Sequence, residues 1–221
     1  MLSTSLGTWV IFAAAAIAPA AGQSTGWTQL FNGRDLGGWE HVGAGSAAVS
    51  HGLIRVCGDM GLLWWKGGKI GNAVLRVTYR TEGKIGNSGV YIRIPIEPRE
   101  PWMPVHYGYE VQIESDPARF HEGDYHVTGT LYSLTKALAR PSRPSPEWNV
   151  MEITLRGPRT IVFVNGVKVT DYTEGRPVPP RKFDYEPLRG PRPDEGYIGL
   201  QNDGKEPVLF KEVALKHLAG R

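Results

Sequence analysis

Cysteine is almost absent from this sequence. Cys57 is the single cysteine among 221 residues, so no disulfide can form within the chain. Stability must therefore come from a packed core, whichever compartment holds the protein. The alternation of apolar and polar residues that ends at Cys57 predicts a packing role for this thiol and not a nucleophilic one.

Basic runs and the common catalytic motifs are also missing. The 25 lysines and arginines and the 22 acidic residues are spread along the chain, and the formal charge is +3. No basic segment can track a phosphate backbone, so nucleic acid is not an expected partner. The chain has no Gly-rich phosphate loop at a strand-to-helix junction and no G-x-S-x-G element. The absence of a fixed repeat disfavours propellers and solenoids.

Long apolar runs are missing beyond the N-terminus. The run from Trp9 to Ile17 is shorter than the ~20 residues of a spanning helix. The small-residue sequences Ala18-Pro19-Ala20 and Ala20-Ala21-Gly22 follow it. We therefore expect residues 1–22 to be a secretory signal peptide, although no lysine or arginine precedes the apolar run; a short membrane anchor is the alternative. The mature protein is expected to be exported, to the periplasm or the extracellular space, without membrane contact.

Glycine and proline, in contrast, are abundant, with 28 and 17 residues. No apolar stripe at helical spacing occurs after residue 26, so the chain predicts an all-β fold of short strands joined by turns. The length suits one sandwich domain over residues 27–219. Asn165-Gly166 is the strongest hairpin signal, between strands at 160–164 and 167–170. Further strands are expected at 48–56, 72–80, 86–94, 108–114, 127–132, 148–155, 197–201 and 208–218.

Three predicted connections, 95–106, 133–147 and 171–195, are unusually long and rich in proline. Long ordered loops on a compact β scaffold are commonly binding elements. Because these loops carry Trp102, Tyr172, Phe183 and Tyr185, we expect them to wall a cleft; mobile surface insertions are the alternative.

Segments 86–93 and 108–114 alternate at the period of a strand, so each has one apolar and one polar face. The polar faces carry Asn87, Tyr91, Arg93, Glu110, Gln112 and Glu114. Amide, phenol, guanidinium and carboxylate groups together supply the donors and acceptors that sugar hydroxyls need. The pattern therefore indicates a site for an oligosaccharide or glycoside, with an ordinary solvated sheet face as the alternative.

Two carboxylates on one strand raise the question of a conventional glycosidase. Glu110 and Glu114 flank Gln112, and ordinary glycoside hydrolysis uses a pair of carboxylates. Glu110 and Glu114 are four residues apart in a strand, so their backbones lie roughly 13 Å apart at ~3.3 Å per residue. A single working carboxylate, Glu110, with Gln112 as a ligand hydrogen-bonder is the simpler hypothesis.

The segment 121–126 gathers two histidines and two carboxylates within six residues. The candidate metal ligands His121, Asp124 and His126 can hold a divalent cation if the loop folds back, although the spacing matches no named zinc signature. A solvated acidic loop with an incidental histidine pair is the alternative. The sequence itself requires no cofactor.

Six short motifs in order carry a family resemblance. They are Leu30-Phe31-Asn32-Gly33-Arg34-Asp35-Leu36-x-x-Trp39, Gly86-Asn87-Ser88-Gly89-Val90-Tyr91-x-Arg93, Gly108-Tyr109-Glu110-Val111-Gln112, Thr128-Gly129-Thr130-x-Tyr132, Glu147-Trp148-Asn149 and Gly199-Leu200-Gln201. From about residue 27 to 218 the chain resembles the 3-keto-disaccharide hydrolase family. The resemblance implies a two-sheet antiparallel jelly-roll sandwich of the concanavalin A-like lectin/glucanase class, bacterial secretion, and action on glycosides oxidised at C3 of the sugar.

The resemblance also implies residue roles. A ketone at C3 acidifies the proton at C2, so one general base can start an elimination at C1 that hydration completes. Glu110 is the expected base and His126 its rival, with Asn87 and Arg93 as oxyanion donors or substrate clamps. The remaining expected substrate contacts are Tyr91, Gln112, Tyr132, Trp148, Asn149 and Gln201. The resemblance also implies a role for a divalent cation, which can replace part of the role of Arg93. A non-catalytic carbohydrate-binding module and a two-carboxylate glycosidase are the alternatives.

Overall fold

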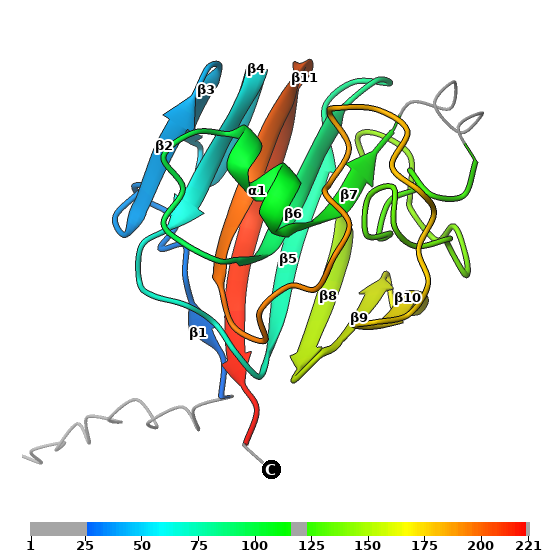
Figure 1. Cartoon of the computed structure of the whole chain (residues 1–221). Helices are drawn as coiled ribbons and strands as arrows, with labels where there is room; N and C mark the ends of the chain where they lie inside the picture. The colour runs from blue at the N-terminus through cyan, green and yellow to red at the C-terminus, as the bar shows by residue number, and fades with distance from the viewer. Residues whose placement is uncertain (1–25, 116–122, 220–221) are drawn as a thin grey trace, which may run out of the picture.

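The strands form two antiparallel sheets stacked face to face (Figure 1). This computed structural model describes residues 26–115 and 123–219. The front sheet contains β2 (Trp39–Gly43), β4 (Leu53–Trp65), β11 (Tyr197–His217), β6 (Asn87–Ile94) and β7 (Tyr109–Glu114), in that order. The back sheet runs from β3 (Ser46–Ser50) through β4, β11, β5 (Ala73–Thr81), β8 (Asn149–Arg156) and β9 (Arg159–Val164) to β10 (Val167–Thr173), and β1 (Thr28–Gln29) pairs with β11. The expected all-β, two-sheet sandwich is confirmed.

Two long strands belong to both sheets. Residues 53–57 of β4 pair with β3, whereas residues 61–65 pair with β2. β11 is one strand of 21 residues where the sequence predicted two. Register shifts between Asn202 and Val208 allow it to pass from β6 in the front sheet to β5 in the back sheet. The gap between the predicted strands 197–201 and 208–218 is thus an irregularity inside a continuous strand.

The core lies between the sheets. Val90 and Ile92 of β6 and Val111 and Ile113 of β7 pack into the same apolar cluster as residues of β5, β8 and β9. β5 alternates buried and part-exposed residues, as expected for a sheet with one solvated face. β6 and β7 are instead buried at every position. Their polar face is therefore enclosed, contrary to the alternative of an ordinary solvated sheet face.

A short helix, α1 (Trp102–Tyr107), covers part of that polar face. Its segment was predicted as a loop because of its prolines, but Pro104 lies in the first turn, where backbone N–H groups have no helical partner. Met103 and Val105 of α1 pack on Trp64 and Tyr91 in a second apolar cluster outside the front sheet. The helix thereby closes one end of the sheet face and leaves the rest open.

Residues 127–132 do not form the predicted strand. Gly129, at φ +90°, interrupts the extended backbone, and only an isolated bridge joins Leu131 to Val111. The segment still lies along the free edge of β7, because Gln112 N donates to Thr130 O and Tyr132 N donates to Glu110 O. This pairing brings the Tyr132 side chain beside the polar face.

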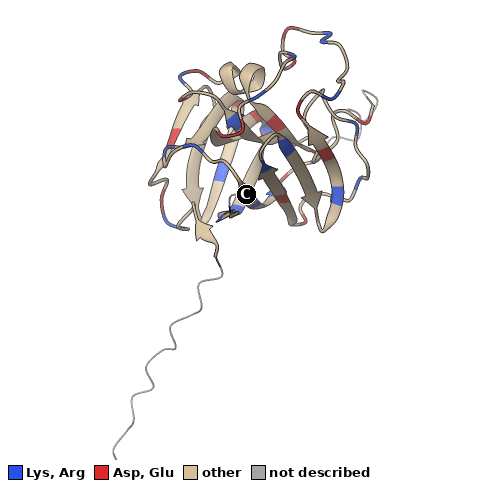
Figure 2. Ribbon diagram, turned by 60° about the horizontal axis from the view of Figure 1, so that its bottom comes forward, with Lys and Arg blue, Asp and Glu red and all other residues tan. Residues whose placement is uncertain are grey.

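The β9–β10 hairpin forms as predicted. Asn165 and Gly166 both have positive φ, 50° and 79°, as a two-residue turn of this kind requires. Figure 2 colours the positions of the charged residues, which are distributed over sheets and loops without gathering by sign. The expected signal peptide, residues 1–22, lies outside the described residues. Within 26–115 and 123–219, no helix is long and apolar enough to span a membrane.

Candidate active site

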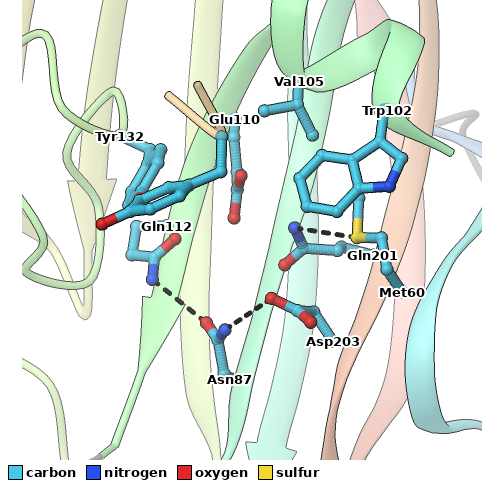
Figure 3. A pocket seen from close by; sticks show the side chains of 10 residues that line it. Met60, Asn87, Trp102, Val105, Glu110, Gln112, Tyr132, Gln201 and Asp203 are labelled. Atoms are coloured by element: carbon cyan, nitrogen blue, oxygen red, sulfur yellow. Dashed lines mark hydrogen bonds between the residues drawn. The ribbon is translucent and has the colours of Figure 1, made fainter. Parts of the chain in front are cut away.

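A pocket of about 390 Å³ opens on the outer face of the front sheet (Figure 3). Its floor comes from four neighbouring strands and its walls from α1 and two long loops. The lining residues are Met60, Asn87, Trp102, Val105, Glu110, Gln112, Tyr132, Tyr185, Gln201 and Asp203. Figure 3 shows the Glu110 carboxylate between the Tyr132 ring on one side and Trp102 on the other. The long loops at 95–106 and 171–195 thus contribute walls to a cleft, as expected.

Strand register brings the polar side chains to one face. Tyr91 pairs with Glu110, Gly89 with Gln112 and Asn87 with Glu114 across the β6–β7 ladder. Gly89 provides the space for the Glu110 side chain, because a Cβ at this position would lie 2.5 Å from Cγ of Glu110. Any larger residue at position 89 would displace the Glu110 side chain.

Glu110 is a buried carboxyl with a strongly altered proton affinity. Only 7% of the residue is exposed. Burial, and then the negative charge of Asp203, raise the pKa of Glu110 to about 8, although hydrogen bonds from Tyr91 and Gln201 oppose the shift. A carboxyl group with such a pKa can both accept and return a proton near neutral pH.

Tyr91 lies beneath the pocket and does not line it. Its hydroxyl donates to Oε2 of Glu110 at 3.2 Å and accepts from Nε2 of Gln201 at 2.7 Å. Burial raises the pKa of Tyr91 well above its ordinary value, so the phenol stays neutral. Tyr91 was expected to bind substrate, and the structure instead places it as a positioning residue for Glu110.

The pocket amides are ordered by a hydrogen-bond chain. Gln112 Nε2 donates to Asn87 Oδ1 at 3.2 Å, and Asn87 Nδ2 donates to Asp203 Oδ2 at 2.9 Å. The Oε1 atoms of Gln112 and Gln201 are buried and have no hydrogen-bond partner among the described residues. Buried acceptors without a hydrogen bond are rare unless a water or ligand serves them, so hydroxyl groups of a bound ligand could donate to these two oxygens.

Arg93 does not reach the pocket, contrary to expectation. Tyr91 pairs with Gly199 and Ile94 with Tyr197, so β6 holds one extra residue at this point. Arg93 has φ +56° in this bulge, which reverses the alternation and turns the guanidinium away from Glu110. It is fully buried and donates to the carbonyl oxygens of Gly157, Arg159 and Pro193 and to the hydroxyl of Thr160. Its role is to join these segments.

Trp148 and Asn149 lie at the back sheet and not at the pocket. Asn149 begins β8, and its amide hydrogen-bonds with Arg143 and Asn165. The charged groups of Arg80 and Lys211 lie over the Trp148 ring, with Cζ of Arg80 at 5.0 Å and Nζ of Lys211 at 5.8 Å from the ring centre. The prediction that these two residues contact substrate in the same site is therefore not supported by the geometry.

His126 lies at the margin of the site. Its ring stacks on Tyr132 with 4.8 Å between ring centres, and it lines a neighbouring hollow rather than the pocket of Glu110. Of the two expected bases, only Glu110 thus faces the pocket directly.

The expected metal ligands are not gathered in the described part of the chain. Asp124 forms ion pairs with Arg140 at 2.7 Å and Lys136 at 3.3 Å, which lower the pKa of its carboxyl. His121 lies outside the described residues, and His126 is engaged with an aromatic ring. No three His, Cys, Asp or Glu side chains within 26–115 and 123–219 are placed to hold a metal ion. The described residues thus gather no ligand set for a divalent cation, and no reaction step is assigned to one.

Asp203 is the pocket residue that sequence reasoning missed. It follows Gln201 at strand spacing, which would have placed both side chains on one face. The predicted strand, 197–201, ends two residues before it, however. Met60 and Val105 were not predicted as pocket residues either, since an apolar side chain in one sequence does not distinguish a pocket wall from the core.

Comparison with known proteins agrees with this architecture. A candidate glycosyl hydrolase from Parabacteroides distasonis ATCC 8503 has 23% identity and a TM-score of 0.71, over 87% of this chain and 99% of that one. A Bacillus subtilis protein of unknown function with a galectin-like fold has 11% identity and a TM-score of 0.64, over 88% and 96%. The B. subtilis carbohydrate-binding module CBM66 has 12% identity and a TM-score of 0.56, over 81% and 95%. At these identities the likeness shows the jelly-roll fold alone.

Family membership comes from the sequence. No match was found among curated proteins. Residues 26–216 match the model of the 3-keto-alpha-glucoside-1,2-lyase-like domain, which confirms the resemblance to the 3-keto-disaccharide hydrolases. Since the match includes nearly all described residues, the chain belongs to the 3-keto-alpha-glucoside-1,2-lyase-like family of carbohydrate-active, glycosyl hydrolase-like proteins.

Proposed function

We propose that this protein cleaves 3-keto-glucosides by elimination across C1 and C2, with Glu110 as the proton-transfer group. The observation that carries the proposal is the buried carboxyl of Glu110, which has a pKa of about 8 and is enclosed with amides in a pocket of about 390 Å³. Elimination beside a ketone needs only one such group, whereas ordinary glycoside hydrolysis needs two. Glu114, the second carboxylate considered, does not line the pocket. Asp203 does line it, and there it accepts a hydrogen bond from Asn87 at 2.9 Å and raises the pKa of Glu110 by its negative charge.

The reaction begins at C2, whose proton the C3 ketone acidifies. The Glu110 carboxylate takes this proton, and the electron pair of the C–H bond forms an enediolate with negative charge on O3. When the C3 carbonyl re-forms, a C1–C2 double bond appears and the C1–O bond breaks. The departing oxygen takes the proton back from Glu110, which regenerates the carboxylate. Water then adds to the unsaturated sugar, so the net reaction is hydrolysis.

Amide groups supply the hydrogen bonds that this chemistry requires. The described lining contains three amides and no lysine or arginine. Asn87 and Gln112 each carry an N–H beyond the one already used within the protein, and these can meet the charge that develops on O3. The amide nitrogen of Gln201 already donates to Tyr91 and Met60. Preorganised donors in a water-poor pocket are effective, because they need no rearrangement during the reaction.

Paired substrates test this function. The purified protein should release the alcohol from methyl 3-keto-glucoside and leave methyl glucoside intact. Cleavage of both compounds would instead indicate a conventional glycosidase. Binding of both without turnover would indicate a carbohydrate-binding module, a function that the shared fold with CBM66 keeps as the second candidate.

The pH profile gives an independent prediction. Glu110 starts the reaction as a carboxylate, so kcat/KM should rise as the group ionises. A pKa of about 8 in the free enzyme predicts a value at pH 9 about tenfold above that at pH 7. Rates should be measured from pH 6 to 10, with the uncatalysed rate subtracted. Tyr91→Phe removes a hydrogen bond that lowers the pKa of Glu110, so its midpoint should move to higher pH; a flat profile would contradict the assignment.

A further inference from the structure

A second hollow of about 310 Å³ adjoins the pocket of Glu110. Tyr185 lines both cavities, and the stacked rings of His126 and Tyr132 provide one side chain to each. The two hollows therefore lie next to each other, with Tyr185 as a shared wall. The second is lined by Tyr125, His126, Ser133, Pro179, Pro180, Lys182, Phe183, Tyr185 and Glu186.

The chemistry of the two hollows differs. Carboxylates and amides dominate the first, whereas rings of tyrosine, phenylalanine, histidine and proline dominate the second. Phe183 and Tyr185 stack almost in parallel, with 5.1 Å between ring centres and 8° between planes. They are 53% and 48% exposed, so this pair presents an apolar, flat surface to solvent. Exposed aromatic surface of this kind typically marks a binding site.

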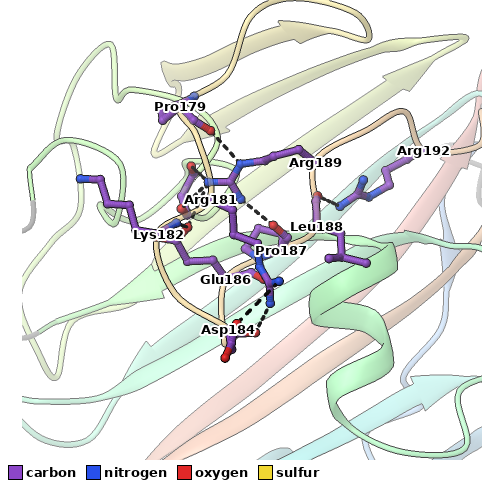
Figure 4. Close-up of polar contacts among 10 residues, drawn as sticks. Pro179, Arg181, Lys182, Asp184, Glu186, Pro187, Leu188, Arg189 and Arg192 are labelled. Carbon is purple, nitrogen blue, oxygen red and sulfur yellow. Dashed lines mark hydrogen bonds and ion pairs between the residues drawn. The ribbon is translucent and has the colours of Figure 1, made fainter.

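Buried charged groups hold these rings in place (Figure 4). Glu186, only 3% exposed, accepts hydrogen bonds from the Lys182 backbone at 2.9 Å and from Arg189 at 3.1 Å. Arg189 also donates to the carbonyl of Pro179 at 2.7 Å and to the hydroxyl of Ser133 at 3.2 Å. The segment that carries Phe183 and Tyr185 is thereby joined to the loop that carries His126 and Tyr132.

Arg192 fixes the same segment to the front sheet. It is 7% exposed and donates to the carbonyl oxygens of His106 at 3.0 Å, Gly108 at 2.9 Å and Leu188 at 2.7 Å. Burying Arg192 and Glu186, and partly burying Arg189, is costly, and each here is compensated by several hydrogen bonds. The loop is thus ordered before any ligand arrives, which reduces the entropy lost on binding.

We propose that the second hollow is a subsite for an aromatic aglycone, attached at C1 of the sugar that Glu110 acts on. This inference rests on the proposed function, because the leaving group at C1 is adjacent to the proton taken at C2. With C2 at Glu110, a C1 substituent that passes Tyr185 enters the second hollow. A planar aryl group can stack there on Phe183, and six of the nine lining residues are aromatic or proline rings, which favour a flat aryl group over a second sugar.

The test compares two substrates that differ only in the aglycone, methyl 3-keto-glucoside and phenyl 3-keto-glucoside. The ratio of kcat/KM for phenyl over methyl should fall about tenfold in Phe183→Ala, on the scale of one lost aromatic contact. Phe183→Tyr, which keeps the ring, should preserve the ratio. Tyr107→Ala is the matched control, since Tyr107 is 51% exposed and lines neither hollow.

Binding separates failure of this inference from failure of the proposed function. Dissociation constants for both compounds, measured by calorimetry on Glu110→Gln protein, need no turnover. If the wild type cleaves neither compound, the proposed function is wrong, and the subsite is still supported when Phe183→Ala removes a binding preference for phenyl. If Phe183→Ala changes neither the kinetic ratio nor the binding preference, the subsite is disproved while the cleavage reaction stands.

Discussion

Glu110→Gln is expected to lower kcat/KM for a 3-keto-glucoside by about a thousandfold, within the range that general acid–base groups contribute. Glutamine keeps the shape of the side chain and can still accept the hydrogen bond from Tyr91. It cannot take a proton from C2, however. The measurement is the initial rate of alcohol release at pH 8, where about half of the wild-type Glu110 is ionised.

Stability provides the folding control for this variant. The pKa of Glu110 in the folded protein, about 8, lies above its ordinary value of 4.5. The unfolded chain therefore releases this proton first, so the contribution of Glu110 to stability is full below about pH 4.5 and is lost as the pH rises towards 8. Glutamine has no such ionisation. At pH 8, the urea midpoint of Glu110→Gln should equal or exceed that of the wild type.

Two matched variants separate the competing mechanisms. His126→Gln tests the rival base, which faces the neighbouring hollow, and Glu114→Gln tests the two-carboxylate glycosidase. We expect either change to lower kcat/KM far less than Glu110→Gln does. Loss of activity in His126→Gln with full activity in Glu110→Gln would transfer the role of base to His126.

The polar set of the front sheet was largely predictable from alternation. Side chains of a strand point alternately to opposite faces, so Glu110 and Gln112 necessarily share a face, opposite Val111 in the core. A single sequence also showed that Asn87 belongs to a neighbouring strand with the same pattern. The register that sets Gly89 against Gln112 could not be read from either strand alone, because it depends on pairing between them.

The failures have a different physical origin. Trp148 and Asn149 were grouped with the site because their motif belongs to the family, yet β8 lies in the other sheet. Membership of a motif does not specify which layer a strand joins. Asp203 was missed because the predicted strand ends at Gln201, whereas β11 continues past this position and pairs with β4 at Asn202 and Gly204.

Arg93 shows how one bulge changes a residue's role. Strand alternation placed its guanidinium beside Glu110, where it would have stabilised the enediolate. The positive φ at Arg93 and the extra residue in β6 direct it away from the pocket instead. A bulge of this kind has no reliable signal in one sequence, because its cause lies in the partner strand.

Arg93→Met is therefore expected to destabilise the fold rather than impair the chemistry. The substitution removes the donor to the buried Thr160 hydroxyl and the donors, at 2.7 and 2.8 Å, to the part-buried carbonyl oxygens of Gly157 and Pro193. At about 1–3 kcal/mol for each unsatisfied group, the free energy of unfolding should fall by roughly 3 kcal/mol. Urea denaturation followed by tryptophan fluorescence measures this loss.

The matched control is Arg159→Met, in which another arginine of the same region is replaced. Its side chain is 51% exposed and pairs with Asp171 at 2.8 Å, and a surface ion pair of this kind contributes less than about 1 kcal/mol.

The activity of Arg93→Met is the second measurement. At a urea concentration where Arg93→Met remains folded, the kcat/KM of this variant should stay within about threefold of the wild type, because Arg93 does not line the pocket. A hundredfold loss of kcat/KM with unchanged stability would instead show that the Arg93 guanidinium takes part in the reaction. The bulge in β6 would then have to rearrange during catalysis so that Arg93 reaches the pocket.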